Sequence, residues 1–112
     1  MLIGMSDRKV WVLQRPVDMR NGYDGLYSIC RSGGFDVMRG DLFLFVSKDR
    51  RQCKVLYWDG TGRRILMKKM EKNLFAKIFD RGEISVMELE LFLDGARLAE
   101  PIALPEKEKY IA

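Results

Sequence analysis

Four aspartates are the side chains of this sequence that come closest to a catalytic set. Grouped in space, they could hold two metal ions and support transfer of a nucleic-acid strand. Each also has a local explanation, because helix starts, strand ends and glycine-rich turns all favour aspartate. We therefore expect structural roles for them, no catalytic residues and no metal site. The four are Asp18, Asp24, Asp41 and Asp59.

Other reactive groups are scarce. The 112 residues include no histidine, which removes the commonest metal ligand and general base and with it Ser-His-Asp and Cys-His zinc chemistry. Cys30 and Cys53 have apolar neighbours, and we expect two buried thiols without a disulfide. The sequence thus predicts a protein that is not an enzyme and needs no cofactor.

Charge is segregated along the chain, whose net charge is +4. Nine basic and three acidic residues lie between Lys48 and Lys72, and seven acidic and three basic residues follow Arg81. This pattern indicates a basic surface that binds a polyanion and an acidic end that faces a different partner. The competing interpretation is a solvated, exposed hairpin.

A basic hairpin is the main candidate for a binding site, with DNA phosphates as its ligand. Its turn is Asp59–Gly62, and basic residues lie on both strands. Trp58 and Tyr57 could stack on bases, although packing within the sheet is the favoured interpretation. Arg20, outside the hairpin, could pair with Asp18 or Asp24, or bind a phosphate. The candidate DNA-binding residues are Arg20, Lys48, Arg50, Arg51, Lys54, Arg63, Arg64, Lys68 and Lys69.

These residues need a sheet to position them, and apolar patterns predict one. We expect a strand over Lys9–Arg15, followed by a helix near Tyr23–Cys30 that ends at Gly33 and Gly34. Three consecutive antiparallel strands are expected next. Apolar and polar residues alternate poorly along the third, which either a bulge or a partly exposed face would explain. Their expected ranges are Leu42–Ser47, Gln52–Asp59 and Arg63–Met70.

The remaining segments complete an α+β fold. A short further strand is expected over Leu74–Phe79, and a capping box at Ser85–Glu88 predicts a helix over Val86–Leu93. We expect one domain over residues 1–112, with a mostly antiparallel sheet of three to five strands, two helices and a loose acidic tail from about residue 101. No apolar run is long enough to cross a bilayer and no signal peptide is recognisable, so a cytoplasmic location is expected.

Several spaced motifs resemble those of one family. Residues 16–26 are similar to its P-x-D-M-R-x-G-[FY]-D-G-L signature, and residues 54–62 to its K-[IVL]-L-x-W-D-G-x-G hairpin. The family is that of the second-open-reading-frame protein, TnpB, of insertion sequence sixty-six. Residues 65–72 depart from it, because the aromatics expected after the hairpin are missing. The matching motif residues include Asp18, Met19, Arg20, Gly22, Asp24, Gly25, Trp58, Asp59 and Gly60.

The resemblance implies an accessory role in DNA transposition beside a separate, larger transposase. DNA at the element ends, the transposase and the element's other accessory protein are the expected partners. One hypothesis is DNA binding through the basic hairpin. The alternative is an adaptor that docks on the transposase, with the acidic helix of residues 85–96 as its surface. A nuclease is disfavoured because histidine is absent and every aspartate has a local role.

Overall fold

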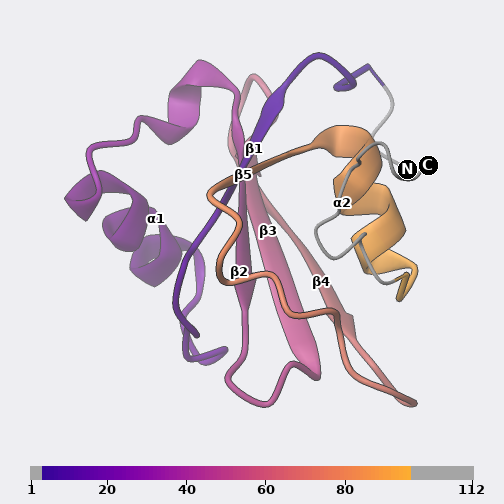
Figure 1. The fold of residues 1–112 in the computed structure, drawn as a ribbon. Helices are drawn as coiled ribbons and strands as arrows, with labels where there is room; N and C mark the ends of the chain where they lie inside the picture. Colours follow the sequence, from indigo (N-terminus) through magenta and orange to yellow (C-terminus); the bar gives the residue numbers. More distant parts are fainter. Residues whose placement is uncertain (1–3, 97–112) are drawn as a thin grey trace.

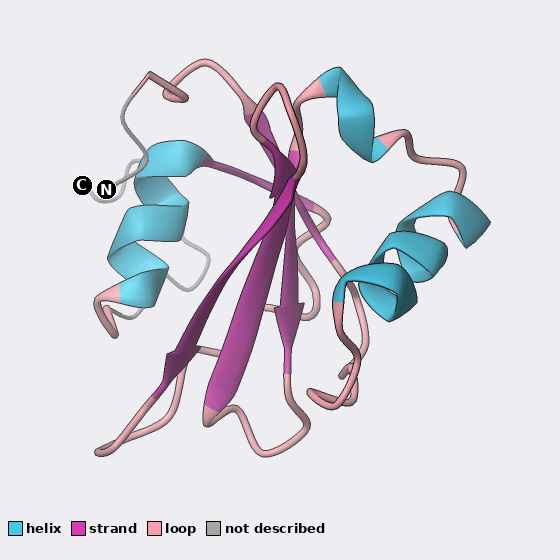
Figure 2. Ribbon diagram, turned by 180° about the vertical axis from the view of Figure 1, so that it is seen from behind, coloured by secondary structure: helices cyan, strands magenta, loops and turns pink. Residues whose placement is uncertain are grey.

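A five-stranded sheet lies between two helical layers in the computed structural model, which describes residues 4–96 (Figure 1). The strand order is β4-β3-β2-β1-β5. One face is covered by α1 (Tyr23–Ser32) and the short 3-10 helix η1 (Val37–Arg39), and the other by α2 (Val86–Leu93) (Figure 2). The predicted α+β class is confirmed, whereas the predicted loose tail lies outside the described residues. The strands are β1 (Lys9–Val12), β2 (Leu42–Val46), β3 (Gln52–Trp58), β4 (Arg63–Lys69) and β5 (Glu83–Ser85).

The antiparallel part of the sheet is the part that local sequence predicts. The strands β2, β3 and β4 pair antiparallel in chain order, as expected. The first strand instead pairs parallel with β2 and antiparallel with β5, because α1 carries the chain back across the sheet between β1 and β2. The predicted first strand is too long, since β1 ends at Val12.

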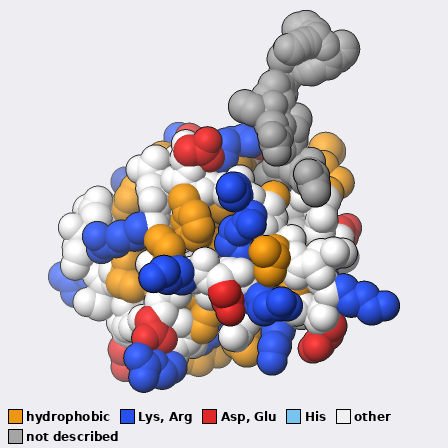
Figure 3. All heavy atoms as spheres, turned by 60° about the horizontal axis from the view of Figure 1, so that its bottom comes forward, with side chains coloured by type: hydrophobic (Ala, Val, Ile, Leu, Met, Phe, Trp, Pro, Cys, Tyr) orange, Lys and Arg blue, Asp and Glu red, His pale blue; other side chains and the backbone are white. Residues whose placement is uncertain are grey.

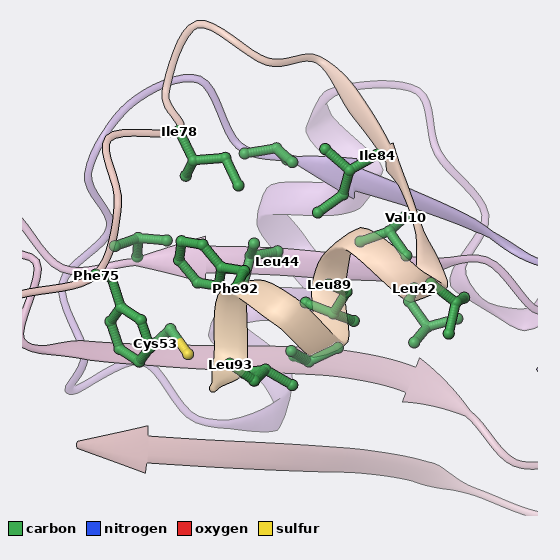
Figure 4. Close-up of a cluster of buried hydrophobic side chains, with 14 residues drawn as sticks. Val10, Leu42, Leu44, Cys53, Phe75, Ile78, Ile84, Leu89, Phe92 and Leu93 are labelled. Atoms are coloured by element: carbon green, nitrogen blue, oxygen red, sulfur yellow. The ribbon is translucent and has the colours of Figure 1, made fainter. Parts of the chain in front are cut away.

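The central strand β2 is buried on both faces and divides the core in two. Leu42, Leu44 and Val46 pack toward α2 with Phe75 and Phe92 (Figure 4). The alternating residues Phe43 and Phe45 pack toward α1 with Leu26 and Cys30. A strand covered on both sides carries an uninterrupted apolar run, which explains the sequence of β2.

Apolar and polar residues alternate poorly along β4 because this strand lies at the edge of the sheet. Its register with β3 is continuous from Gln52 opposite Lys69 to Trp58 opposite Arg63, so no bulge is present. Both faces of β4 are only partly covered. Basic edge residues also discourage pairing with further strands.

The predicted strand over Leu74–Phe79 is wrong. This segment is a loop in which Phe75 and Ile78 are buried, whereas Leu74 is exposed. Apolar residues here anchor a loop, and the further strand is β5, which hydrogen bonds to β1.

The predicted start of α2 is confirmed. Ser85 Oγ accepts a hydrogen bond from the Glu88 amide at 3.0 Å, and Glu88 Oε1 accepts one from the Ser85 amide at 2.9 Å. This reciprocal pair satisfies two helix-end donors. No helix within residues 4–96 has the length and apolarity needed to span a membrane.

Candidate nucleic-acid interface

The nine candidate DNA-binding residues do not form one ribbon surface. Paired residues of antiparallel strands share a face, so Arg63 and Lys69 lie on the α1 face of β4, and Arg64 and Lys68 on its α2 face. Along the strand, Arg63 and Lys69 are separated by about 20 Å. The cations therefore fall into two groups at opposite ends of the hairpin. Two further residues, Lys54 and Lys68, have side chains that are hydrogen bonded within the fold.

Lys54 is the first of these two hydrogen-bonded residues. The prediction that it lies on an exposed surface is wrong. It is only 9% exposed, because β3 is a central strand with α1 packed over this face. Its Nζ donates hydrogen bonds to the carbonyl oxygens of Met19 at 2.8 Å and Asn21 at 2.7 Å. A buried ammonium needs such acceptors, and here they hold the loop before α1 against the sheet.

Lys68 is the second residue whose side chain is hydrogen bonded within the fold. Its Nζ donates to the Leu93 carbonyl at the end of α2. The last carbonyls of a helix lack partners within the helix and attract cations. Lys68 therefore caps α2 and is not free to bind an external phosphate.

The loop of residues 18–25 explains most of the motif at the start of α1. Asp18 accepts hydrogen bonds from the amide and the guanidinium of Arg20, the latter at 2.6 Å from Nη2. Asn21 Nδ2 donates to the Asp18 carbonyl at 2.9 Å. A Cβ at Gly25 would lie 2.3 Å from Asn21 Oδ1, so a larger residue there would displace the Asn21 side chain. Gly25 lies in the first turn of α1, and this close approach accounts for a glycine at that position.

Arg20 pairs with Asp18, one of the two partners left open by the sequence. The guanidinium hydrogen bond and then the backbone amide of Arg20 lower the pKa of Asp18 from 3.8 to about 2. Both side chains are at least half exposed. The pair therefore stabilises the loop above the ordinary pKa of the carboxyl group, and this contribution is lost as the pH falls toward 2.

An Arg20→Ala variant should raise the pKa of Asp18 without restoring it to 3.8. The side-chain hydrogen bond disappears, but the amide of residue 20, which lies 2.8 Å from Asp18 Oδ1 in the parent, still donates to it. Carboxyl carbon NMR during a pH titration measures the midpoint in both proteins. A parent Asp18 that titrates at 3.8 would show that the pair does not form in solution.

One end of the molecule gathers exposed cations from three loops and from the end of β4, and we call it the basic end. The β2–β3 loop is joined to the segment after β4 by hydrogen bonds from the Met70 amide to the Arg51 carbonyl at 2.6 Å and from the Phe75 amide to the Arg50 carbonyl at 2.8 Å. The loop of residues 16–20 lies beside residues 47–49 around a shared depression. Figure 3 shows this end, with basic side chains spread across it. The basic end comprises Arg20, Lys48, Arg51, Lys69 and Lys72.

Most cations of the basic end are unpaired. Apart from Arg20, none of them forms a salt bridge within the described part of the chain. The carboxylate of Asp49 is engaged by Ser47 Oγ at 2.7 Å and by the Arg51 amide at 3.0 Å, and the charge of Arg51 acts on it without a salt bridge. Arg50 is less available, since its Nη1 donates to the Phe75 carbonyl at 3.0 Å. The basic end therefore presents positive charge to solvent.

The opposite end of the hairpin holds Arg63 and Arg64. Arg63 lies over the Tyr27 ring at 5.1 Å and pairs with Asp24 at 3.0 Å, which fixes it against α1. Arg64 is 64% exposed and lies 3.9 Å from Asp59. Trp58 packs on the α1 side of the sheet, as the favoured interpretation predicts.

The four aspartates are separated and each has a partner in the fold; the partners of Asp18 and Asp59 are local, whereas those of Asp24 and Asp41 are distant in sequence. Asp18 and Asp24 pair with arginines, and Asp41 Oδ2 accepts from Trp11 Nε1 at 3.0 Å. Asp59 Oδ1 accepts from the amides of the turn that it opens. No three acidic or cysteine side chains within residues 4–96 are placed to share a metal ion.

The two cysteines are free and buried. Burial raises the pKa of Cys30 and that of Cys53 to about 12. Both thiols are therefore protonated near neutral pH and are poor nucleophiles.

Comparison with known proteins places these features in a family context. The family model described as IS66 Orf2 like protein, where IS66 is insertion sequence sixty-six, matches residues 8–103. The uncharacterized protein y4jC of Sinorhizobium fredii (strain NBRC 101917 / NGR234) is 34% identical over 68 residues, which are 60% of this chain and 58% of that protein. The chain thus spans less than two thirds of this relative's length. No solved structure matches the chain.

Proposed function

The chain belongs to the family of IS66 Orf2-like proteins, and from this premise we propose that it assists DNA transposition as a non-catalytic, DNA-binding accessory protein. In this proposal the basic end binds the phosphates of DNA at the element ends. The transposase and the other accessory protein of the element are its partners, in the cytoplasm. The sequence motifs and the family match support the accessory role, and the DNA contact is argued from charge.

The observation that carries the proposal is the group of unpaired cations at the basic end. Lys48, Arg51, Lys69 and Lys72 are exposed and come from the end of β4 and from loops that hydrogen bonds hold together. Cations on a defined surface displace counterions from DNA, and this release drives binding. Because the loops are fixed by the sheet, little ordering cost opposes it.

The placement of the acidic residues and thiols supports a non-catalytic role. Strand transfer by two metal ions needs carboxylates that converge on one point, whereas Asp18, Asp24, Asp41 and Asp59 are used by separate turns and pairs. The buried, protonated cysteines do not supply a nucleophile. We propose that the chemistry of strand transfer belongs to the separate transposase.

A Lys48→Ala/Arg51→Ala/Lys69→Ala variant should bind terminal-repeat duplex more weakly and with less dependence on salt. If the four unpaired cations each neutralise one phosphate, log affinity of the parent falls with log salt at a slope of about −3 to −4. Removing three of them should flatten that slope by about 2 to 3 units. Fluorescence anisotropy at several salt concentrations measures both quantities.

A matched control removes the same charge elsewhere. The Lys9→Ala/Arg31→Ala/Lys77→Ala variant has the same net charge as the test variant, but its substitutions lie outside the basic end and outside the pocket described below. Circular dichroism checks that both variants fold. If the two triple variants show the same slope, binding follows net charge and the basic end is not the DNA surface.

One observation favours the adaptor as the second candidate. Met87 and Leu91 lie four residues apart on α2, on the side opposite its buried residues, and are 75% and 48% exposed. An exposed apolar pair on a helix suits a protein contact. A transposase pull-down that survives high salt and fails with Met87→Lys/Leu91→Lys would support this candidate.

A further inference from the structure

A pocket of about 380 Å³ lies at the end of the hairpin opposite the basic end. Its walls come from three segments that are distant in sequence: residues 5–8 before β1, residues 38–40 at η1, and the turn end of the β3–β4 hairpin, residues 57–64. The volume is within the range of small-ligand sites and does not admit a DNA duplex. The lining residues used below are Arg8, Arg39, Tyr57, Trp58, Asp59 and Arg64.

The pocket carries a surplus of positive charge. Three arginines line it and Asp59 is its single carboxylate. Oδ1 of Asp59 is taken by the amides of Thr61 at 3.0 Å and Gly62 at 2.9 Å, and these hydrogen bonds hold the pKa of Asp59 below its ordinary value. The carboxylate thus stays charged and serves the turn, which leaves the arginines in excess.

The arginines differ in their freedom to bind an anion. Arg8 Nη1 donates to the Gly40 carbonyl at 2.7 Å, so this guanidinium is fixed as part of the wall. Arg64 lies 3.9 Å from Asp59, which is beyond hydrogen-bonding distance. The side chain of Arg39 is exposed and has no polar partner among residues 4–96. Arg39 and Arg64 can therefore both turn toward a bound phosphate.

The rest of the wall is suited to a flat ring. Tyr57 and Trp58 are half-buried, and neither polar tip has a hydrogen-bond partner within the described part of the chain. Partly buried tyrosine and tryptophan usually satisfy these groups. Met5 and Met38 also line the pocket, and their polarizable side chains adapt to aromatic surfaces. An aromatic ring with hydrogen-bonding edges would satisfy both features.

We propose that this pocket holds one unpaired nucleotide of single-stranded DNA, with its base against Trp58 and its phosphate on Arg39 and Arg64. The proposal rests on the proposed function for its choice of DNA as the ligand. Base stacking on aromatic side chains and arginine–phosphate pairing are the two elements of single-strand recognition. The basic end would then bind duplex, and the pocket at the far end of the hairpin would bind an unpaired strand beside it.

The test uses the full chain with a ten-residue thymidine oligonucleotide as the probe. In a Trp11→Phe background Trp58 is the remaining tryptophan, and its fluorescence should be quenched as the probe binds. The Arg39→Ala/Arg64→Ala variant should bind the labelled probe at least tenfold more weakly in anisotropy. Trp58→Leu, which keeps an apolar side chain, should weaken binding about tenfold, and circular dichroism checks that each variant folds.

Two further ligands separate a DNA strand from a free nucleotide. Thymidine, which lacks phosphate, should bind much more weakly than thymidine monophosphate, and the monophosphate more weakly than the oligonucleotide. Equal affinity for monophosphate and oligonucleotide would overturn the assignment to a DNA strand. Unquenched Trp58, or undiminished binding by the folded Arg39→Ala/Arg64→Ala variant, would overturn the pocket itself.

The basic-end variant makes the two proposals independent. Lys48→Ala/Arg51→Ala/Lys69→Ala should lose duplex binding and keep the quenching of Trp58 by the oligonucleotide. If duplex binding persists while Trp58 is still quenched, the proposed function fails at the basic end and the pocket stands. If this variant abolishes the quenching, the single strand binds at the basic end and the pocket proposal fails.

Discussion

Replacing Lys54 by methionine should lower the free energy of unfolding by about 2 to 4 kcal/mol. Methionine keeps the length and the apolar stem of the side chain, so the core contacts of β3 survive. The ammonium is lost, and the carbonyls of Met19 and Asn21, which accept its hydrogen bonds at 2.8 and 2.7 Å, are left without their donor. Each unsatisfied acceptor costs about 1 to 3 kcal/mol, and partial access of water reduces that cost.

Urea denaturation measures this effect, and Lys69→Met is its matched control. Lys69 lies on the same face of the hairpin but is exposed, so its replacement should change stability by no more than about 0.5 kcal/mol. Amide hydrogen exchange should also show that residues 18–22 lose protection in Lys54→Met alone. Equal stability of the two variants would mean that Lys54 does not hold the loop.

The role of Lys54 could not be predicted from composition and spacing. A lysine beside a basic turn is usually exposed, and counting charges along residues 48–72 assigns it to the same surface as Lys48 and Arg51. Its burial depends on α1 covering this face of β3, which is a long-range contact. A sequence signal did exist, because Lys54 stands inside the apolar run from Cys53 to Leu56.

The elements that depend on contacts between residues close in sequence were the ones predicted correctly. The turn at Asp59, the capping box at Ser85 and the glycine end of α1 all depend on hydrogen bonds or backbone angles within a few residues, and they were predicted correctly. The parallel pairing of β1 with β2 and the strand β5 depend on the assembled sheet. A strand of three residues carries too little pattern to be recognised.

The candidate site was predicted in part for the same reason. A tight turn places two basic segments near each other, but only the register of β4 shows that Arg64 and Lys69 face opposite sides and lie at opposite ends. Arg8 and Arg39 were not among the residues predicted from the sequence. They reach the pocket from before β1 and from η1, and neither segment has a motif that indicates a binding role.

The loop after β4 supplies the other large expected effect, because its apolar residues anchor it to the core. Phe75 is fully buried, and its ring stacks on Phe92 with centroids 4.7 Å apart. Its amide donates to the Arg50 carbonyl, and its carbonyl accepts from Arg50 Nη1. Arg50 has a φ of 59°, an unfavourable angle for a residue with a side chain, so these hydrogen bonds help to hold the β2–β3 loop in its conformation.

Phe75→Ala should therefore lower the free energy of unfolding by about 3 to 5 kcal/mol, from lost burial and the cavity left beside Phe92. Leu74→Ala is the control, since Leu74 is 40% exposed and its loss should cost less than about 1 kcal/mol. Chemical denaturation measures both. Because Phe75 also fixes Arg50, the folded Phe75→Ala protein should show faster amide exchange at residues 48–51 and weaker duplex binding. A variant that loses stability but keeps full exchange protection in this loop would show that the loop holds its shape without the core anchor.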